Sequence, residues 1–546
     1  MKTPSGALPI LAACLLASCA AGPHVAKETP RPNVVIILAD DMGFSDAGCY
    51  GGEIHTPNLD TLAHGGVRFT QFYNTARCWP SRACILTGYY AQQVRRDELP
   101  GLKGGAGGHR PAWARLLPEL LHPLGYRSYH SGKWHVDGKV LAGGFDRSYS
   151  LNDHDRHFYP KRHELDDRPL PAVKPESGYY SVTAVAQHAI DRLAEHQAQH
   201  RDQPFFLYLA FIAPHFPLQA LPEDIAVYRD RYRQGWDVAR RERYERMRQM
   251  GIVNCPLSAL DPATIPRWNL PESKLRELIG PGEVGHAVPW DTLTAEQQQF
   301  QAAKMAIHAA MIHRIDIETG RVRDQLKAMG AFENTVVFFL SDNGASAEQI
   351  IRGDMHDRTA PPGSGPTYLC LGPGWSSAAN TPFRLHKSWV HEGGITTPLI
   401  VHWPRGIAAR NELRHTPGHL IDLAPTILEL AGGKWPESFA GKPVPAGPGK
   451  SLVPALAKDG SVAHEYFWWY HERNRAIRMG DWKLVAERDR PWELYDLRTD
   501  RSESRNLAAE HPDKVRDLDR AWTAHMEEFR DLAAGDQSDG RSGKAR

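Results

Sequence analysis

Three apolar runs of this chain each end in side chains that are capable of chemistry. The runs and the residues that follow them are Val34–Leu38 before Asp40 and Asp41, Phe205–Ile212 before His215, and Thr335–Leu340 before Asp342 and Asn343. Continuous apolar runs of this length are typical of parallel or mixed strands that are buried on both faces. Open sheets of such strands bind ligands beyond the carboxyl ends of the strands. We therefore expect these polar side chains to meet at one edge of one sheet.

Segments with helical spacing lie between the apolar runs. The predicted helices are Leu59–Gly66, Trp113–Pro123, Val182–His196 and Thr294–Met329, the last of them capped by Gly330. A further strand is expected at Tyr126–His130 and another at Thr397–His402. Alternating strands and helices predict an α/β fold with a large mixed, mostly parallel sheet between helices.

The sequence changes character after the Gly- and Pro-rich stretch 441–449. Arg475–Val485 reads as a hairpin with a Gly-Asp turn, Glu493–Leu497 as a strand and Pro512–Leu532 as a helix. We expect an α/β domain over residues 31–450 and a smaller unit over 451–533, built from an antiparallel sheet and a helix. The Gly-, Ser- and Asp-rich tail 534–546 is expected to be disordered.

The first 22 residues predict export. An apolar stretch from Ala7 to Ala17 is too short to span a bilayer, and Leu16-Ala17-Ser18-Cys19 resembles a bacterial lipoprotein box. Cys14 also fits such a box but would leave a cramped apolar region, and an ordinary cleaved secretory signal is the alternative. We expect a protein of the periplasm or cell surface, attached to a membrane only through a lipid on Cys19.

Composition excludes several classes of protein. The 546 residues are 41% hydrophobic and 24% charged, as in folded soluble proteins, and the net charge of +1 does not favour nucleic-acid binding. The seven cysteines are too few for a disulfide framework. The cysteines outside the signal region and the Cys78 motif could form one disulfide bond, which the sequence does not identify; they are Cys49, Cys84, Cys255 and Cys370.

The acidic residues at the strand ends suit a hard metal ion. Asp40, Asp41, Asp342 and Asn343 offer oxygen ligands without sulfur or imidazole, which favours Ca²⁺ or Mg²⁺ over zinc. The alternative is that both pairs simply form turns, which these residue types favour.

A short motif connects these groups to one reaction. Cys78-Trp79-Pro80-Ser81-Arg82, followed by Leu86-Thr87-Gly88, resembles the signature of the type I sulfatases of the alkaline phosphatase superfamily. In that family a maturation enzyme oxidises the cysteine to formylglycine, whose hydrated aldehyde is the nucleophile. The resemblance extends over nearly the whole mature chain and implies an alkaline phosphatase-like fold.

The resemblance also implies a role for each matched residue. One Ca²⁺ ion would be bound by Asp40, Asp41, Asp342, Asn343 and the modified Cys78. Arg82 would hold the hydrate, and Lys133 and Lys387 would bind the sulfate. His215, with Lys387, would assist the leaving oxygen, and His135 would remove a proton in the step that expels sulfate. Taken by itself, each of these lysines and histidines would be interpreted as a solvated or structural side chain.

The expected activity is hydrolysis of sulfate monoesters of phenols or carbohydrates, as in arylsulfatases. Two features depart from the family: Val136-Asp137 replaces the usual Leu-Gly, and the polar insert 148–175 either lines the substrate mouth or forms a surface loop. One alternative is a phosphonate or phosphate ester hydrolase on the same fold. Another is a protein that binds sulfated glycans and is never matured.

Overall fold

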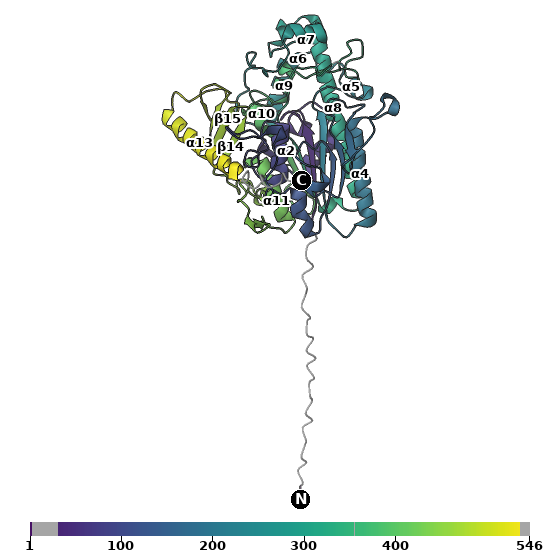
Figure 1. Ribbon diagram of the computed structural model, residues 1–546, viewed down its shortest axis with the longest axis vertical. Helices are drawn as coiled ribbons and strands as arrows, with labels where there is room; N and C mark the ends of the chain where they lie inside the picture. Colours follow the sequence, from purple (N-terminus) through teal and green to yellow (C-terminus); the bar gives the residue numbers. More distant parts are fainter. Residues whose placement is uncertain (3–30, 354, 536–546) are drawn as a thin grey trace, which may run out of the picture. The chain divides into compact units, whose positions relative to one another are not determined.

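The computed structural model describes residues 1–2, 31–353 and 355–535, and a large twisted sheet forms its centre (Figure 1). Among these residues, eleven strands join in the order β10-β2-β9-β8-β1-β7-β3-β4-β5-β6, with β11 paired to β2. The strands are β1 (Asn33–Asp40), β2 (Val67–Tyr73), β3 (Arg127–Gly132), β4 (Arg147–Leu151), β5 (His163–Leu165), β6 (Arg168–Pro169), β7 (Phe205–Pro214), β8 (Thr335–Ser341), β9 (Thr396–His402), β10 (Glu412–Arg414) and β11 (Gly418–His419).

The middle of the sheet is parallel. β1 lies between β7 and β8 and is parallel to both, β3 continues the parallel order from β7, and β4 continues it from β3. β9 runs antiparallel to β8 and β2, so the sheet is mixed. The predicted α/β class and mostly parallel sheet are confirmed.

Both faces of the central strands are buried, and this explains their continuous apolar sequences. In β1, Val35 and Ile37 face one core, whereas Val34 and Ile36 face the other. The same alternation recurs in β7 and β8. Because successive side chains of a strand point to opposite faces, a strand covered on both sides needs apolar residues at every position.

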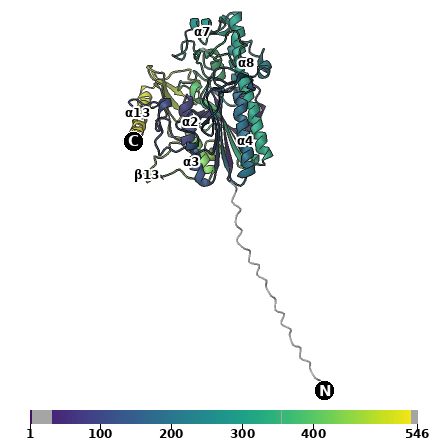
Figure 2. The same cartoon turned by 45° about the vertical axis from the view of Figure 1, so that its right-hand side comes forward.

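Helices cover the two faces of the sheet. Figure 2 shows α4 and α8 on one side and α2 and α3 on the other, in agreement with the membership of the two cores. The helices are α1 (Pro57–His64), α2 (Cys78–Thr87), α3 (Leu117–Leu121), α4 (Ser181–Gln199), α5 (Pro222–Tyr228), α6 (Gly235–Gln249), α7 (Glu272–Leu278), α8 (Ala295–Ala328), α9 (Pro373–Ala379), α10 (Glu392–Ile395), α11 (Leu423–Leu430), α12 (Val453–Ala457) and α13 (Pro512–Gly535).

For two of the predicted helices, the observed ends agree with the prediction to different degrees. α8 starts at a Thr294 cap that accepts from the Gln297 backbone N–H, and Gly330 follows it with a left-handed φ of 67°, as expected. The helix expected at Trp113–Pro123 is wrong in extent, because α3 covers only Leu117–Leu121. Pro118 lies in its first turn, and a 3-10 turn, His122–Leu124, follows it directly. Pro123 lacks the N–H that would continue the α-helical hydrogen bonds.

The C-terminal sheet contains β14 (Phe467–His471), β15 (Asn474–Met479), β16 (Trp482–Ala486) and β17 (Glu493–Asp496), all antiparallel. The predicted hairpin is confirmed, because Met479 pairs with Trp482 across the Gly-Asp turn. This sheet and α13 lie beside the large sheet in Figures 1 and 2. The indole N–H of Trp469 donates to the Asn74 carbonyl at 2.8 Å, so the small sheet supports the loop that leads to Cys78.

A short two-stranded ribbon, β12 (Ser438–Phe439) and β13 (Lys442–Pro443), precedes the C-terminal sheet. The boundary proposed near residue 450 stays a prediction. α13 continues to Gly535, two residues into the predicted tail. The rest of that tail and the predicted signal region beyond Lys2, including Cys14 and Cys19, lie outside the described residues. Within the described part of the chain, no helix has the length and apolar character that crossing a membrane requires. The five cysteines described there are free thiols.

Candidate active site

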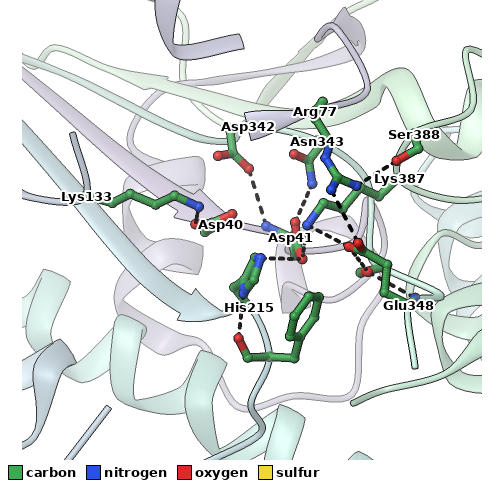
Figure 3. A network of polar contacts seen from close by, with 12 residues as sticks. Asp40, Asp41, Arg77, Lys133, His215, Asp342, Asn343, Glu348, Lys387 and Ser388 are labelled. Carbon is green, nitrogen blue, oxygen red and sulfur yellow. Dashed lines mark hydrogen bonds and ion pairs between the residues drawn. The ribbon is translucent and has the colours of Figure 1, made fainter. Parts of the chain in front are cut away.

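The polar residues that follow β1, β7 and β8 meet at one edge of the sheet, as expected (Figure 3). The Asn343 side-chain N–H donates to Asp41 Oδ1 at 2.6 Å, and the Asp41 backbone N–H donates to Asp342 Oδ1 at 3.4 Å. Asp41 has a left-handed φ of 67°, a conformation that residues other than glycine rarely adopt. Such strained positions cluster at functional sites.

Cys78 is the first residue of α2 and lies against this strand-end group. Its sulfur and one ligand atom each of Asp40, Asp41 and His215 lie within 4.8 Å of one another. The side chain is buried, and burial together with the nearby Asp40 raises the pKa of the thiol to about 12. The unmodified residue is therefore a neutral thiol at physiological pH, and a weak nucleophile.

Two oxygen atoms of this group have no hydrogen-bond partner. Asp40 Oδ1 and Asn343 Oδ1 are both buried, and neither accepts a hydrogen bond from any residue that the structure describes. A buried, unpaired oxygen is costly unless a ligand satisfies it. A carboxylate oxygen and an amide oxygen of this kind fit a hard cation such as Ca²⁺. The residues predicted as metal ligands therefore fit the ion.

Two lysines approach the carboxylates from different loops. Lys133, directly after β3, forms an ion pair with Asp40. Lys387 Nζ lies 2.8 Å from Asp41 Oδ2 and 3.1 Å from Glu348 Oε2. Both lysines are buried, so the site holds two cations away from water beside Cys78.

Arg82, one turn along α2 from Cys78, contacts the predicted metal ligands. Its Nε and Nη2 donate to Asp342 Oδ2 at 3.0 and 2.8 Å, and its Nη1 donates to the Lys133 carbonyl at 2.8 Å. The guanidinium therefore orients Asp342 and the Lys133 loop. Its expected contact with an oxidised Cys78 stays a prediction.

The two predicted histidines are neutral side chains, and His215 lies within this group. Burial and the neighbouring Lys387 lower the pKa of His215 well below 6.5, and burial and Lys133 do the same for His135. His215 Nδ1 lies 2.5 Å from the Phe216 carbonyl, and its Nε2 lies 3.8 Å from Asp41 Oδ2. His135 has a φ of 55°, and its ring packs on Trp79 with the centroids 5.7 Å apart.

Three further residues of the site were not predicted from the sequence. Arg77 Nη2 lies 3.3 Å from Glu348 Oε1, and Glu348 in turn holds Lys387. His154, from the insert 148–175, packs its ring on His135 with the centroids 5.2 Å apart. Arg77 could have been found as the neighbour of Cys78. Nothing in the sequence around Glu348 or His154 marks them.

Comparisons with known proteins agree with the expectation from the sequence. The sulfatase family model matches residues 32–433, and the model for the C-terminal part of N-sulphoglucosamine sulphohydrolase matches residues 383–531. The chain is 33% identical to an uncharacterized sulfatase of Schizosaccharomyces pombe, over 93% of this chain and 96% of that protein. It is 31% identical to an arylsulfatase of Klebsiella aerogenes, over 80% of this chain and 94% of that protein.

Solved structures show the same fold at lower identity. Ps i-CgsB, solved in complex with k-i-k-neocarrahexaose, matches with a TM-score of 0.63 and 22% identity, over 91% of this chain and 93% of that one. A phosphonate monoester hydrolase of Silicibacter pomeroyi matches with a TM-score of 0.55 and 18% identity, over 92% and 96%. The family match carries the assignment, because it covers most of the chain. The chain belongs to the sulfatase family, in the alkaline phosphatase-like fold, and the enzyme class expected from its sequence, a sulfuric ester hydrolase, is confirmed.

Proposed function

We propose that this sulfatase hydrolyses sulfate monoesters to an alcohol or phenol and inorganic sulfate, with Cys78 oxidised to formylglycine and one Ca²⁺ ion bound. One observation carries the proposal: the unpartnered oxygens of Asp40 and Asn343 lie in a buried group that also contains Cys78, Lys133 and Lys387. A cation site, a modifiable residue and two buried lysines are the parts that this chemistry needs.

Asp40, Asp41, Asp342, Asn343 and the oxidised Cys78 would hold the calcium ion. When bound, the ion neutralises sulfate charge and lowers the pKa of the attacking hydroxyl group. Arg82 keeps Asp342 in place through its two hydrogen bonds. Asp342 is therefore preorganised by the protein.

Maturation of Cys78 explains how so buried a residue becomes reactive. As a thiol it is neutral, since its pKa is raised to about 12. The hydrated aldehyde made by a formylglycine-generating enzyme supplies a hydroxyl group at the same position, and a nucleophile of this kind is activated by a nearby metal or base. Maturation thus turns an inert position into a reactive one.

Lys133 and Lys387 would bind the sulfate group, because preorganised cations stabilise the charge that develops as the S–O bond breaks. His215 donates from Nδ1 to the Phe216 carbonyl, which leaves Nε2 of its neutral ring without a proton. Together with Lys387, whose ammonium group would supply the proton, it would assist the leaving oxygen. The neutral His135 would accept a proton in the step that releases sulfate.

Expression with and without a formylglycine-generating enzyme tests the proposal. Mass analysis of the Cys78 peptide should show the aldehyde only in the first sample, and only that sample should hydrolyse nitrophenyl sulfate. Faster turnover of a nitrophenyl phosphonate ester would instead favour the phosphonate hydrolase, whose fold the chain shares. A Cys78 peptide that remains entirely thiol in the native host would favour a glycan-binding protein.

A further inference from the structure

A cavity of about 490 Å³ lies beside His135. It is lined by Trp134, His135, Val136, Gly138, Lys139, Val140, Ser150, Asn152, His154, Glu164 and Asp167. A benzene ring needs a cavity of only about 150 Å³, so this space holds more than a single aryl ring. One wall is formed by the segment that follows β3. The other wall is formed by the polar insert 148–175, whose role the sequence does not reveal.

The sheet register brings the insert to the reacting groups. β4 is parallel to β3, with Ser150 opposite Gly132, so the residues after β4 emerge at the same edge as Lys133 and His135. The loop after β4 is held by the buried Asp153, which accepts from Arg156 at 2.9 Å and from the Lys161 backbone N–H at 2.8 Å. His154 is therefore presented by an ordered loop.

His154 carries a polar atom that nothing described in this chain satisfies. Its Nε2 is buried and has no hydrogen-bond partner among residues 31–353 and 355–535. Burial and the nearby Lys133 also lower the pKa of its imidazole well below 6.5. A neutral imidazole has one donor and one acceptor nitrogen, which suits a hydroxyl group.

The charged groups of the cavity are already engaged. Lys139 Nζ lies 3.1 Å from Glu164 Oε2, and Asp167 accepts from the backbone N–H groups of Val140 and Leu141 at 3.1 and 3.0 Å. Among the described lining residues there are therefore two carboxylates and one lysine, and that lysine is already paired with one of the carboxylates. A second sulfate group placed here would meet more negative than positive charge.

We propose that His154 determines substrate specificity, by a hydrogen bond to a hydroxyl group of an uncharged sugar whose sulfate ester lies at Cys78. The inference rests on the proposed function and narrows it to monosulfated carbohydrates. Sites built to bond a hydroxyl group reject ligands that lack it, because the buried polar group is then left unpaired.

Steady-state kinetics of matured, calcium-loaded enzyme tests the proposal. The substrates are N-acetylglucosamine 6-sulfate, galactose 4-sulfate, glucosamine 2-N,6-O-disulfate and nitrophenyl sulfate, and the variants are His154→Ala, His154→Gln and His402→Ala. We expect His154→Ala to lower kcat/KM for at least one monosulfated sugar by about 10- to 100-fold more than for nitrophenyl sulfate. His154→Gln, which keeps hydrogen-bonding atoms, should recover part of that loss. Wild-type enzyme should prefer that monosulfated sugar to the disulfated one.

His402 is the matched control. It is also buried with an unpartnered ring nitrogen, Nδ1, but it pairs with Val337 near the start of β8, at the opposite edge of the sheet. His402→Ala should leave the ratio of sugar to aryl turnover as in wild type.

Three outcomes would overturn the inference. Equal losses on sugar and aryl esters would mean that His154 only supports His135, and a shifted pH profile would accompany them. Hydrolysis of nitrophenyl sulfate without any sugar sulfate, or a preference for the disulfated sugar, would also refute it while leaving the proposed function standing. Absence of turnover with every sulfate ester, despite a matured Cys78, would instead refute the proposed function itself.

Discussion

Two buried charge clusters lie at the carboxyl end of β1, and among the described residues only one of them has all of its carboxylate oxygens hydrogen-bonded. The strand-end cluster consists of Asp40, Asp41, Asp342, Lys133 and Lys387, and the Arg243 cluster consists of Arg243, Asp46, Glu53 and His308. Both combine carboxylates with cations away from water. The number of charges does not distinguish them.

The hydrogen bonds do distinguish them. In the Arg243 cluster both oxygens of Glu53 accept from Arg243, at 2.7 and 2.8 Å. Asp46 accepts from Arg243, from the Gly43 N–H and from His308, at 2.7, 2.9 and 3.1 Å. In the strand-end cluster, by contrast, Asp40 Oδ1 has no partner among the residues described.

The pKa values show the same contrast. Burial raises the pKa of Asp41 to about 6, because Lys387 only partly opposes it and Asp40 and Asp342 add to it. Burial would also raise the pKa of Glu53, but Arg243 holds it at about 2. Burial would also raise the pKa of Asp40, but Lys133 and Arg82 hold it well below 3.8, so Asp41 is the carboxylate of the strand-end cluster whose burial its neighbours do not offset. In the Arg243 cluster every carboxylate oxygen is paired, although His308 Nδ1 has no partner among the described residues, and we interpret this cluster as structural.

Replacement of Cys78, beside the strand-end cluster, should have the largest effect on activity. Cys78→Ala removes the proposed nucleophile and should lower kcat by at least about 10³-fold, while the melting temperature stays near that of wild type. Cys78→Ser should be nearly inactive too, unless the host converts serine. Substantial activity of Cys78→Ala with an unchanged melting curve would refute the assignment.

Replacement of Arg243 should have the largest effect on stability. Arg243→Ala leaves Glu53 and Asp46 buried without their cation, and this should cost about 3–5 kcal/mol of unfolding free energy. Arg241→Ala, an exposed arginine of the same helix α6, is the control and should cost less than about 0.5 kcal/mol. Denaturant unfolding measures both, and similar costs would contradict the structural role.

Acid should weaken the Arg243 cluster in a defined range of pH. The pKa of Glu53 is lowered from 4.5 to about 2 on folding, so its contribution is complete above pH 4.5 and is lost as the pH falls towards 2. The shift corresponds to about 3 kcal/mol. Glu53→Gln should therefore show a flatter dependence of unfolding free energy on pH between 4.5 and 2. An unchanged slope would show that Glu53 is not held by Arg243.

Calcium removal should have a smaller effect on stability and a complete effect on activity. At a calcium concentration about 100 times Kd, binding stabilises the folded state by about 2.7 kcal/mol, which a chelator removes. Asp41→Asn relieves repulsion, so in chelator its melting temperature should equal or exceed that of wild type. Asp46→Asn is the control and should destabilise the protein in calcium and chelator alike. A lower melting temperature of Asp41→Asn in chelator would contradict the view that the burial of the Asp41 carboxylate is not offset by its neighbours.

Much of the fold was predictable because its signals are local. The buried strands β1, β7 and β8 appear as apolar runs, α8 appears with both of its caps, and the β15–β16 hairpin appears through its turn. The direction of β9 was not predictable, since a strand has the same sequence pattern whether its neighbour is parallel or antiparallel. β14 was missed because its aromatic residues show no alternation, as both of its faces are buried.

The residues of the candidate site also fall into those that could be predicted from the sequence and those that could not. Cys78, Lys133 and the strand-end carboxylates stand next to recognisable strands or motifs. Glu348 and His154 reach the site only because distant loops meet there. Glu348 holds Lys387, which lies 39 positions further along the chain, and His154 reaches His135 because β4 pairs with β3. Contacts between residues so far apart in the sequence leave no pattern among neighbouring positions.

The sequence alone determined the family and the edge of the sheet at which the predicted site residues gather, because a motif and an apolar run followed by a polar residue are properties of neighbouring positions. Only the tertiary structure decided which charges are paired and which polar atoms are left free. Asp40 and Asp46 are the same residue type six positions apart, and the sequence does not tell them apart. Arg243 and His308, supplied by distant helices, satisfy one of them and leave the other open to a ligand.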